Sequence, residues 1–118
     1  MEVAYTYEAK PIYLNAWRTM HHFQWAKIRK EWRESFHYLY LANPQAFRGS
    51  PVDIVVEHEV KSRLPDVCAV MECYKAALDG LVDGGLLIDD GPGYINSVTF
   101  VQPVKTGRDA LTLRIRAS

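Results

Sequence analysis

The segment from Leu64 to Asp90 constrains the fold most strongly, because it combines helix start and stop signals with one apolar stripe. Pro65 disfavours helix at the residue before it, and Asp66 is a good N-cap. Gly84-Gly85 is a stop signal, because glycine adopts the left-handed conformation without strain. Between these signals, apolar residues recur at helical spacing: Val67, Val70, Met71, Tyr74, Leu78, Leu81 and Val82. The pattern predicts an amphipathic helix over residues 67–83.

The rest of the chain contains further strand and helix patterns. Alternating apolar residues or a high content of Tyr, Val and Ile predict strands, and apolar residues at three- and four-residue steps predict a second helix. The expected elements are strands at 3–14, 52–60, 94–102 and 110–116, a loop at 15–19 and a helix at 21–41. The order β-α-β-α-β-β predicts an α+β fold in one domain, residues 1–118. We expect a single mixed four-stranded sheet with two helices on one face.

Composition limits the class of protein. Hydrophobic residues make up 48% and charged residues 24%, which is typical of a globular domain. Basic and acidic residues number 14 each, and this zero net charge counts against nucleic-acid binding unless the charges are segregated. No apolar run reaches the roughly 20 residues of a membrane span, and the start of the chain lacks a signal-peptide pattern. With two cysteines expected as reduced thiols, we expect a cytoplasmic protein without a membrane partner.

Acidic side chains flank a lysine in the central segment. Asp66 precedes the predicted helix, Lys75 lies within it, and Asp89-Asp90 follow it. Carboxylates attract a hard divalent cation, and a lysine beside them can hold a phosphate, which together suit metal-assisted phosphodiester cleavage. From the chemistry alone, a surface helix with a capping aspartate and a solvated Asp-Asp turn is the simpler interpretation.

The same segment resembles the RusA-type Holliday-junction resolvases of phages and prophages. The resemblance rests on Lys75-Ala-Ala-Leu-Asp-Gly-Leu, Gly84-Gly85 and Ile88-Asp89-Asp90, with Asp66 nine residues before Lys75 as in actinobacteriophage-like members. It extends through Leu14-Asn15-Ala16-Trp17-Arg18 and covers most of the chain, residues 12–116. The resemblance implies a crossover junction endodeoxyribonuclease of DNA recombination and repair. Such enzymes are homodimers that nick two opposed strands of a four-way junction with Mg²⁺, or with Mn²⁺ in its place.

The resemblance also implies roles for individual residues. The expected catalytic residues are Asp66, Asp90 and Lys75, and the expected metal ligands are Asp66, Asp89, Asp90 and Glu72. The resemblance further implies DNA contacts by Asn15 and Arg18, in the loop at 15–19. Chemistry alone adds Arg29, Lys30 and Arg33, along one edge of the helix at 21–41, and Lys61 and Arg63, which precede Asp66, because cations can hold a phosphate. The family's second acid and its asparagine fall at Cys68 and Ala69, whose side chains bind Mg²⁺ poorly. Glu72 is included among the ligands because it lies one turn later and can replace the missing acid.

Other interpretations stay open at this point. The Arg29–Arg33 edge is explained equally well by a solvated helix face, and Asn15 by a turn. A junction-binding or structural DNA-binding protein that has lost cleavage would keep the same basic residues. An unrelated α+β interaction domain is a third alternative. On the predicted strand at 52–60, His58 lies on the apolar face, where we expect a hydrogen-bonded core or rim histidine and not a catalytic one.

Overall fold

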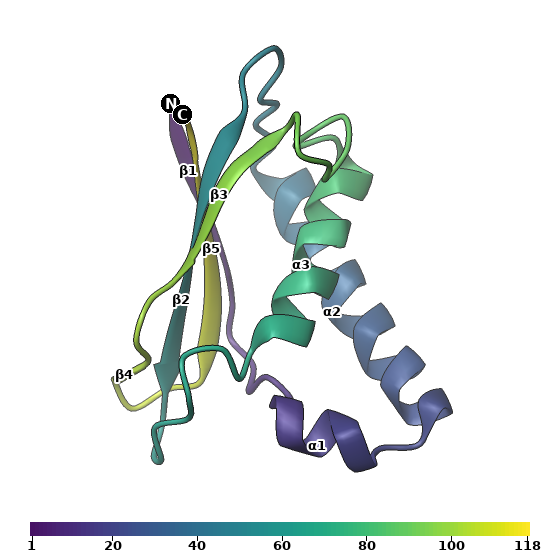
Figure 1. Cartoon of the computed structure of the whole chain (residues 1–118), viewed down its shortest axis with the longest axis vertical. Coiled ribbons are helices and arrows are strands. Elements are labelled where there is room, and N and C mark those ends of the chain that lie inside the picture. Colours follow the sequence, from purple (N-terminus) through teal and green to yellow (C-terminus); the bar gives the residue numbers. More distant parts are fainter.

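The computed structural model describes all 118 residues as one sheet with its helices on one side (Figure 1). The elements are β1 (Glu2–Tyr7), α1 (Leu14–Thr19), α2 (His22–Ala42), β2 (Val52–Val60), α3 (Met71–Gly84), β3 (Ile95–Phe100), β4 (Val104–Lys105) and β5 (Ala110–Ala117). The expected α+β class is confirmed. The sheet has five strands instead of the expected four, because the two-residue β4 pairs with the end of β2.

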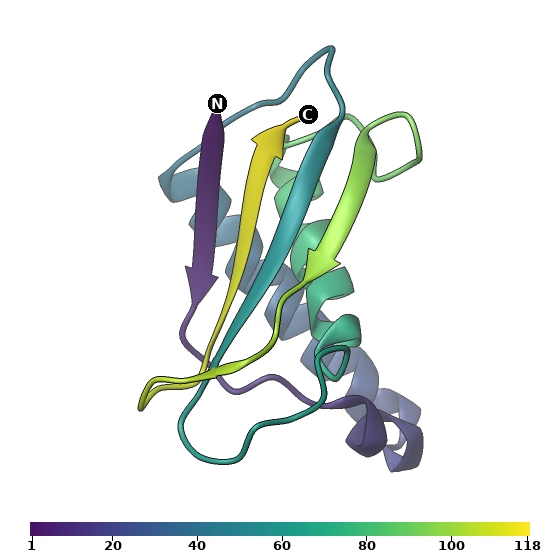
Figure 2. The ribbon, with the colours of Figure 1, turned by 60° about the vertical axis from the view of Figure 1, so that its left-hand side comes forward.

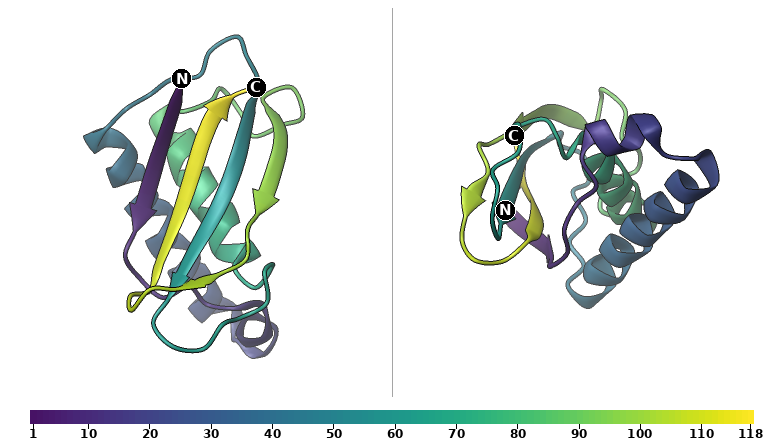
Figure 3. Two further views of the ribbon diagram at one scale, coloured as in Figure 1. Left: turned by 90° about the vertical axis from the view of Figure 1, so that its left-hand side faces the viewer. Right: turned by 90° about the horizontal axis from the view of Figure 1, so that it is seen from below.

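The main sheet is mixed, with strand order β1-β5-β2-β3. β5 lies between β1 and β2 and is antiparallel to both, so Leu113 has Tyr5 on one side and Val56 on the other. β2 and β3 are parallel neighbours, joined by a crossover that contains α3 (Figure 2). The last strand of the sequence therefore fills the middle of the sheet, and both termini lie at the same end of it (Figure 3).

The core lies between the sheet and the helices α2 and α3. Alternate residues of β2 are buried, from Val52 to Val60, as the alternating sequence pattern predicts. Val52, Ile54 and Val56 belong to the same apolar cluster as Phe36 of α2 and Leu78 and Leu81 of α3. The apolar stripes of both predicted helices therefore face the sheet, except that Met71 is exposed and Val67 lies in the turns before α3. No helix combines the length and the apolar character that a membrane-spanning segment needs.

The chain leaves the first strand earlier than expected. β1 ends at Tyr7 and not near residue 14, and the buried Pro11 lies in the connection that follows. A short helix, α1, replaces the loop predicted at 15–19. It is anchored by the buried Trp17, whose indole N–H donates to the backbone carbonyl of Ile12 at 2.9 Å. This anchor turns the chain away from the sheet after β1.

α3 begins later than expected. Its N-cap is Val70, without a side-chain hydrogen bond, so the prediction of Asp66 as N-cap was wrong. Residues 67–70 form turns, in which the N–H of Ala69 donates to the backbone carbonyl of Asp66 at 3.0 Å. The carbonyl of Ala69 accepts the N–H of Leu14 at 3.1 Å, and this bond connects the turns to α1. Asp66 is thereby left exposed in the connection between β2 and α3.

Candidate functional site

Lys75 and Asp90, two of the three expected catalytic residues, form an ion pair. The Nζ of Lys75 also lies 3.6 Å from Oδ1 of Asp79, one turn further along α3. The hydrogen bond from Lys75 lowers the pKa of the Asp90 carboxyl, and the same bond raises the pKa of Lys75. Both side chains are therefore charged at neutral pH, with a positive group held between two carboxylates.

The connection from α3 to β3 brings Asp90 back to Lys75. Gly85 has a φ of +115°, and the N–H groups of Gly85 and Leu86 both donate to the carbonyl of Leu81. The next two side chains, Leu86 and Leu87, are buried and anchor the turn. Oδ1 of Asp89 then accepts the backbone N–H of Asp90 at 2.8 Å. The glycine stop and the apolar run read from the sequence thus position the Asp-Asp pair.

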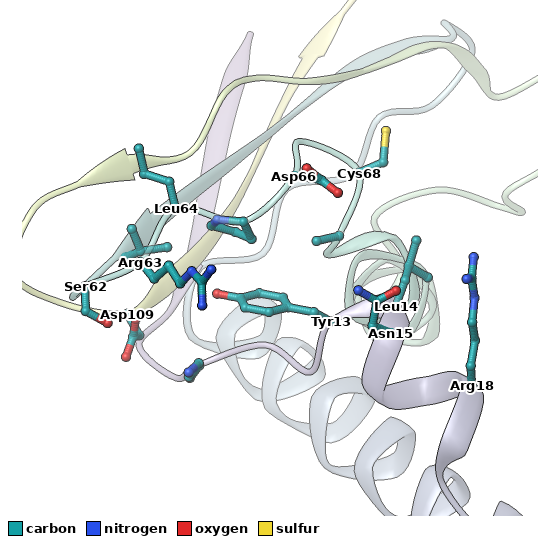
Figure 4. A pocket seen from close by; sticks show the side chains of 14 residues that line it. Tyr13, Leu14, Asn15, Arg18, Ser62, Arg63, Leu64, Asp66, Cys68 and Asp109 are labelled. Atoms are coloured by element: carbon teal, nitrogen blue, oxygen red, sulfur yellow. The ribbon is translucent and has the colours of Figure 1, made fainter.

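Asp66, the third expected catalytic residue, lines a cavity of about 640 Å³ that neither Lys75 nor Asp90 lines (Figure 4). One wall comes from residues 10–18, and the other comes from residues 60–69. Three of the expected DNA contacts, Asn15, Arg18 and Arg63, line the same cavity. The structure therefore brings together segments that are separated by more than forty residues in the sequence.

Lys61, another expected DNA contact, begins the connection that forms the second wall. Its backbone N–H donates to Oδ1 of Asp109 at 3.0 Å, and Asp109 itself lines the cavity. The side chain of Lys61 does not line the cavity, although those of Ser62 and Arg63 do.

The remaining expected DNA contacts, Arg29, Lys30 and Arg33, lie on α2 and line a second cavity, of about 630 Å³. Lys75 and Glu72 of α3 line it as well. This cavity therefore lies between the two long helices, and it contains the lysine of the Lys75–Asp90 pair.

Each cation of α2 in this cavity has a carboxylate partner within the chain. Arg33 donates to both carboxylate oxygens of Asp83, at 2.6 and 2.8 Å, and the Nζ of Lys30 lies 3.8 Å from Glu34. Arg29 donates to Glu72 at 2.5 Å, and its guanidinium lies over the ring of Trp25 at 4.3 Å from the centroid. The two arginine pairs join α2 to α3, and they leave these cations less available to a phosphate backbone.

The four expected metal ligands are not gathered in one place. Glu72 is held by Arg29, Asp90 is held by Lys75, and Asp66 lines the other cavity. No three His, Cys, Asp or Glu side chains lie close enough to hold an ion together. Asp89 and Asp90 still offer two neighbouring carboxylates. Their oxygens fit Mg²⁺, which binds proteins through one or two carboxylates and completes its shell with water and phosphate oxygens.

His58 differs in part from the expectation. It is buried, with 4% of its surface exposed, but neither ring nitrogen has a hydrogen-bond partner. The expected hydrogen bond was therefore wrong, because the strands beside His58 present apolar side chains such as Leu111 opposite it. Burial lowers the pKa of His58, so the ring is neutral at neutral pH. It packs edge-on against the ring of Tyr13, with the centroids 5.7 Å apart.

Three cavity residues, Lys10, Tyr13 and Asp109, were missed in the sequence. Tyr13 fell within the predicted strand at 3–14, whereas it is the residue before α1 in the structure. Pro11 was the only signal that the strand ends early. Burial and the neighbouring carboxylate of Asp109 raise the pKa of Tyr13, so its hydroxyl stays protonated at neutral pH.

Neither the protein-family models nor the curated proteins compared with this chain match it. Its function is therefore inferred from the arrangement of its residues and from the resemblance of its sequence motifs.

Proposed function

We propose that this protein is a homodimeric, Mg²⁺-dependent endonuclease that resolves four-way DNA junctions in the cytoplasm, as its resemblance to RusA-type resolvases implies. The observation that supports the proposal best is the contact between Lys75 and Asp90, which are 15 residues apart in the sequence. The resemblance names both residues as catalytic. Their contact places a lysine beside the adjacent carboxylates Asp89 and Asp90, the groups that metal-assisted phosphodiester cleavage uses.

The proposed chemistry assigns a task to each of these side chains. Asp89 and Asp90 would supply oxygen ligands for Mg²⁺. When bound, the ion would lower the pKa of an attacking water and neutralise charge on the phosphate. Lys75 orients the Asp90 carboxylate and presents a protonated ammonium to a phosphate oxygen. Asp66 is the third acid of the proposal and lies on the wall of a separate cavity.

DNA binding by a chain of zero net charge requires segregated cations. Arg18 and Arg63 line the Asp66 cavity and form no ion pair within the chain, whereas Arg29 and Arg33 are paired with acids. Arg18 and Arg63 form the cationic part of this surface, and the neutral amide of Asn15 lies in the same cavity. We therefore assign the main DNA contact to the Asp66 cavity and a lesser one to the α2 residues.

A cleavage assay on synthetic DNA tests the proposal. We expect the wild-type protein to nick a four-way junction, and not the matching linear duplex, only when Mg²⁺ or Mn²⁺ is present. Asp90→Asn should abolish nicking and keep the gel shift of the junction, because an amide lacks the charge that a hard cation needs. Glu34→Gln, which removes one exposed acid from α2, is the matched control and should nick normally. Normal nicking by Asp90→Asn would remove Asp90 from the site.

A second candidate function is junction binding without cleavage. It is favoured by the residues at Cys68 and Ala69, where the resemblance expects an acid and an asparagine, and by the engagement of Glu72 with Arg29. In that case the wild-type protein binds the junction in a gel shift, with an affinity that depends on salt because the protein neutralises phosphates. It does not nick the junction with either Mg²⁺ or Mn²⁺. The same assay therefore separates the two functions.

A further inference from the structure

The cavity that contains Asp66 has an aromatic side chain at its centre. Tyr13 points from the start of α1 toward Arg63 on the opposite wall (Figure 4). The buried His58 packs against the ring at an interplanar angle of 66°, with 5.7 Å between the centroids. The Nζ of Lys10 lies over the ring, 5.9 Å from its centroid. Lys10 is exposed, so its side chain can move off this face of the ring and leave it to another planar group.

The backbone around Tyr13 is fixed before any ligand binds. Its carbonyl accepts the N–H groups of Ala16 at 2.9 Å and Trp17 at 3.2 Å, which begin α1. The next residue, Leu14, donates its N–H to the carbonyl of Ala69 on the other wall at 3.1 Å. The two walls are therefore connected directly beside the ring, so that little ordering is needed when a ligand enters.

The cations around the ring have no carboxylate partner, as is also true of Lys27, Arg48, Lys61, Lys105 and Arg116 elsewhere in the chain. Four arginines elsewhere (Arg29, Arg33, Arg108 and Arg114) each form an ion pair. The three cations of the cavity, Lys10, Arg18 and Arg63, form none. Unpaired cations beside a cavity are available to an anion such as phosphate.

The cavity also contains hydrogen-bonding groups that a simple phosphate would not use. The carboxylates of Asp66 and Asp109 and the amide of Asn15 line it together with the cations. Carboxylates repel a bare anion, but they accept hydrogen bonds from the exocyclic amino groups of bases. An aromatic ring, unpaired cations and acceptor groups together match a nucleotide: a base, a sugar and a phosphate. A volume of about 640 Å³ lies within the range of small-ligand sites.

We propose that the Asp66 cavity holds one unpaired nucleotide of branched DNA, with its base stacked on Tyr13 and its phosphates against Arg63 and Lys10. This inference rests on the proposed function, since it names the part of the DNA that the same site selects. A base inside a duplex is already stacked on both faces, whereas a base at a branch point or in a single strand is free to enter. The cavity thus selects DNA that contains an unpaired base.

The inference is tested with a fluorescein-labelled single-stranded hexanucleotide, whose binding is followed by fluorescence anisotropy. We expect the wild-type protein to bind it more tightly than the same sequence in a duplex. Tyr13→Leu should weaken binding roughly tenfold, because stacking on an aromatic ring is lost, and Tyr13→Phe should bind like the wild type. Leucine keeps an apolar side chain beside His58, and the folding of each variant is checked by circular dichroism and thermal unfolding.

Matched charge variants separate the cavity from general attraction to DNA. Arg63→Gln should weaken hexanucleotide binding, whereas Arg116→Gln, which removes an exposed and unpaired arginine of β5, should not. Equal binding by the wild type and Tyr13→Leu, or no binding by the wild type, would overturn the inference. Junction nicking is measured in parallel. If hexanucleotide binding depends on Tyr13 but no nicking occurs, the inference stands and the proposed endonuclease function fails. If the protein nicks the junction but its hexanucleotide binding does not depend on Tyr13, the proposed endonuclease function stands and the inference about the cavity fails.

Discussion

A Cβ atom on Gly80 of α3 would lie 2.1 Å from the backbone carbonyl oxygen of Arg33 on α2. The two helices therefore touch at this point, and no rotation of a side chain can relieve a clash with the backbone. Close to this contact, both carboxylate oxygens of Asp83 on α3 accept hydrogen bonds from Arg33 on α2. The close packing of α2 against α3 over the sheet therefore requires a residue without a side chain at position 80.

We expect Gly80→Ala to lower the free energy of unfolding by about 2 kcal/mol or more, because overpacking must push the helices apart. Alanine is favoured over glycine within a helix by about 1 kcal/mol, and this gain is too small to compensate. Urea unfolding measures the difference. Gly93→Ala is the control, since nothing lies within 4 Å of a Cβ there, and it should change stability by less than about 0.5 kcal/mol. Wild-type stability of Gly80→Ala would show that the helices separate without cost.

Lys75→Ala should reduce the single-turnover rate of junction nicking by roughly 100-fold, because a positioned positive charge on the phosphate is lost. Lys75→Arg keeps the charge but changes its geometry, so it should recover only part of the rate. The ion pairs of Lys75 are partly exposed, so the free energy of unfolding should change by less than about 1 kcal/mol in either variant. An unchanged nicking rate in Lys75→Ala would make Lys75 an ordinary surface lysine.

Cys68→Asp should strengthen cleavage, because it restores the acid that the resemblance expects at this position. Cys68 is exposed and lines the cavity beside Asp66, so the substitution buries no charge. We expect a lower Mg²⁺ concentration for half-maximal nicking, or the first detectable nicking if the wild type only binds junctions. Asparagine has nearly the same shape as aspartate but no charge, so Cys68→Asn should behave like the wild type. Identical metal titrations for all three proteins would count against a metal-binding role of this wall.

The burial of His58 should make folding stability depend on pH. Its pKa is lowered in the folded state, mainly by burial and against the opposing effect of Asp109 and Glu59. An unfolded histidine binds a proton with a pKa of about 6.5, so stability should fall as pH drops below that value toward the folded-state pKa. The slope contributed by one proton is up to about 1.4 kcal/mol per pH unit. Unfolding of His58→Leu, followed from about pH 7.5 to pH 5, should lack this contribution. Parallel curves for the two proteins would mean that folding leaves the pKa of His58 unchanged.

Much of the fold follows from local patterns in the sequence. The alternation from Val52 to Val60 and the apolar stripe before Gly84-Gly85 predict β2 and α3, because an element that buries one face must repeat apolar residues at its own period. α1 escaped prediction, because six residues are too few to show a helical period, and its Trp17 is buried by distant contacts. The beginning of α3 was misplaced because a good N-cap residue, Asp66, does not cap when the chain near it is bound elsewhere.

The candidate site was predictable only as a set of residue types. The sequence by itself determined that Asp66 and Asp90 flank one helix, which contains Lys75 and ends in a glycine turn. Only the tertiary structure decided that Asp90 returns to Lys75 while Asp66 shares a cavity with Tyr13. The physical reason is that the period of the apolar residues indicates only which face of each element is buried. The contacts between elements depend instead on strand order, on close approaches such as that at Gly80, and on hydrogen bonds between segments far apart in the chain.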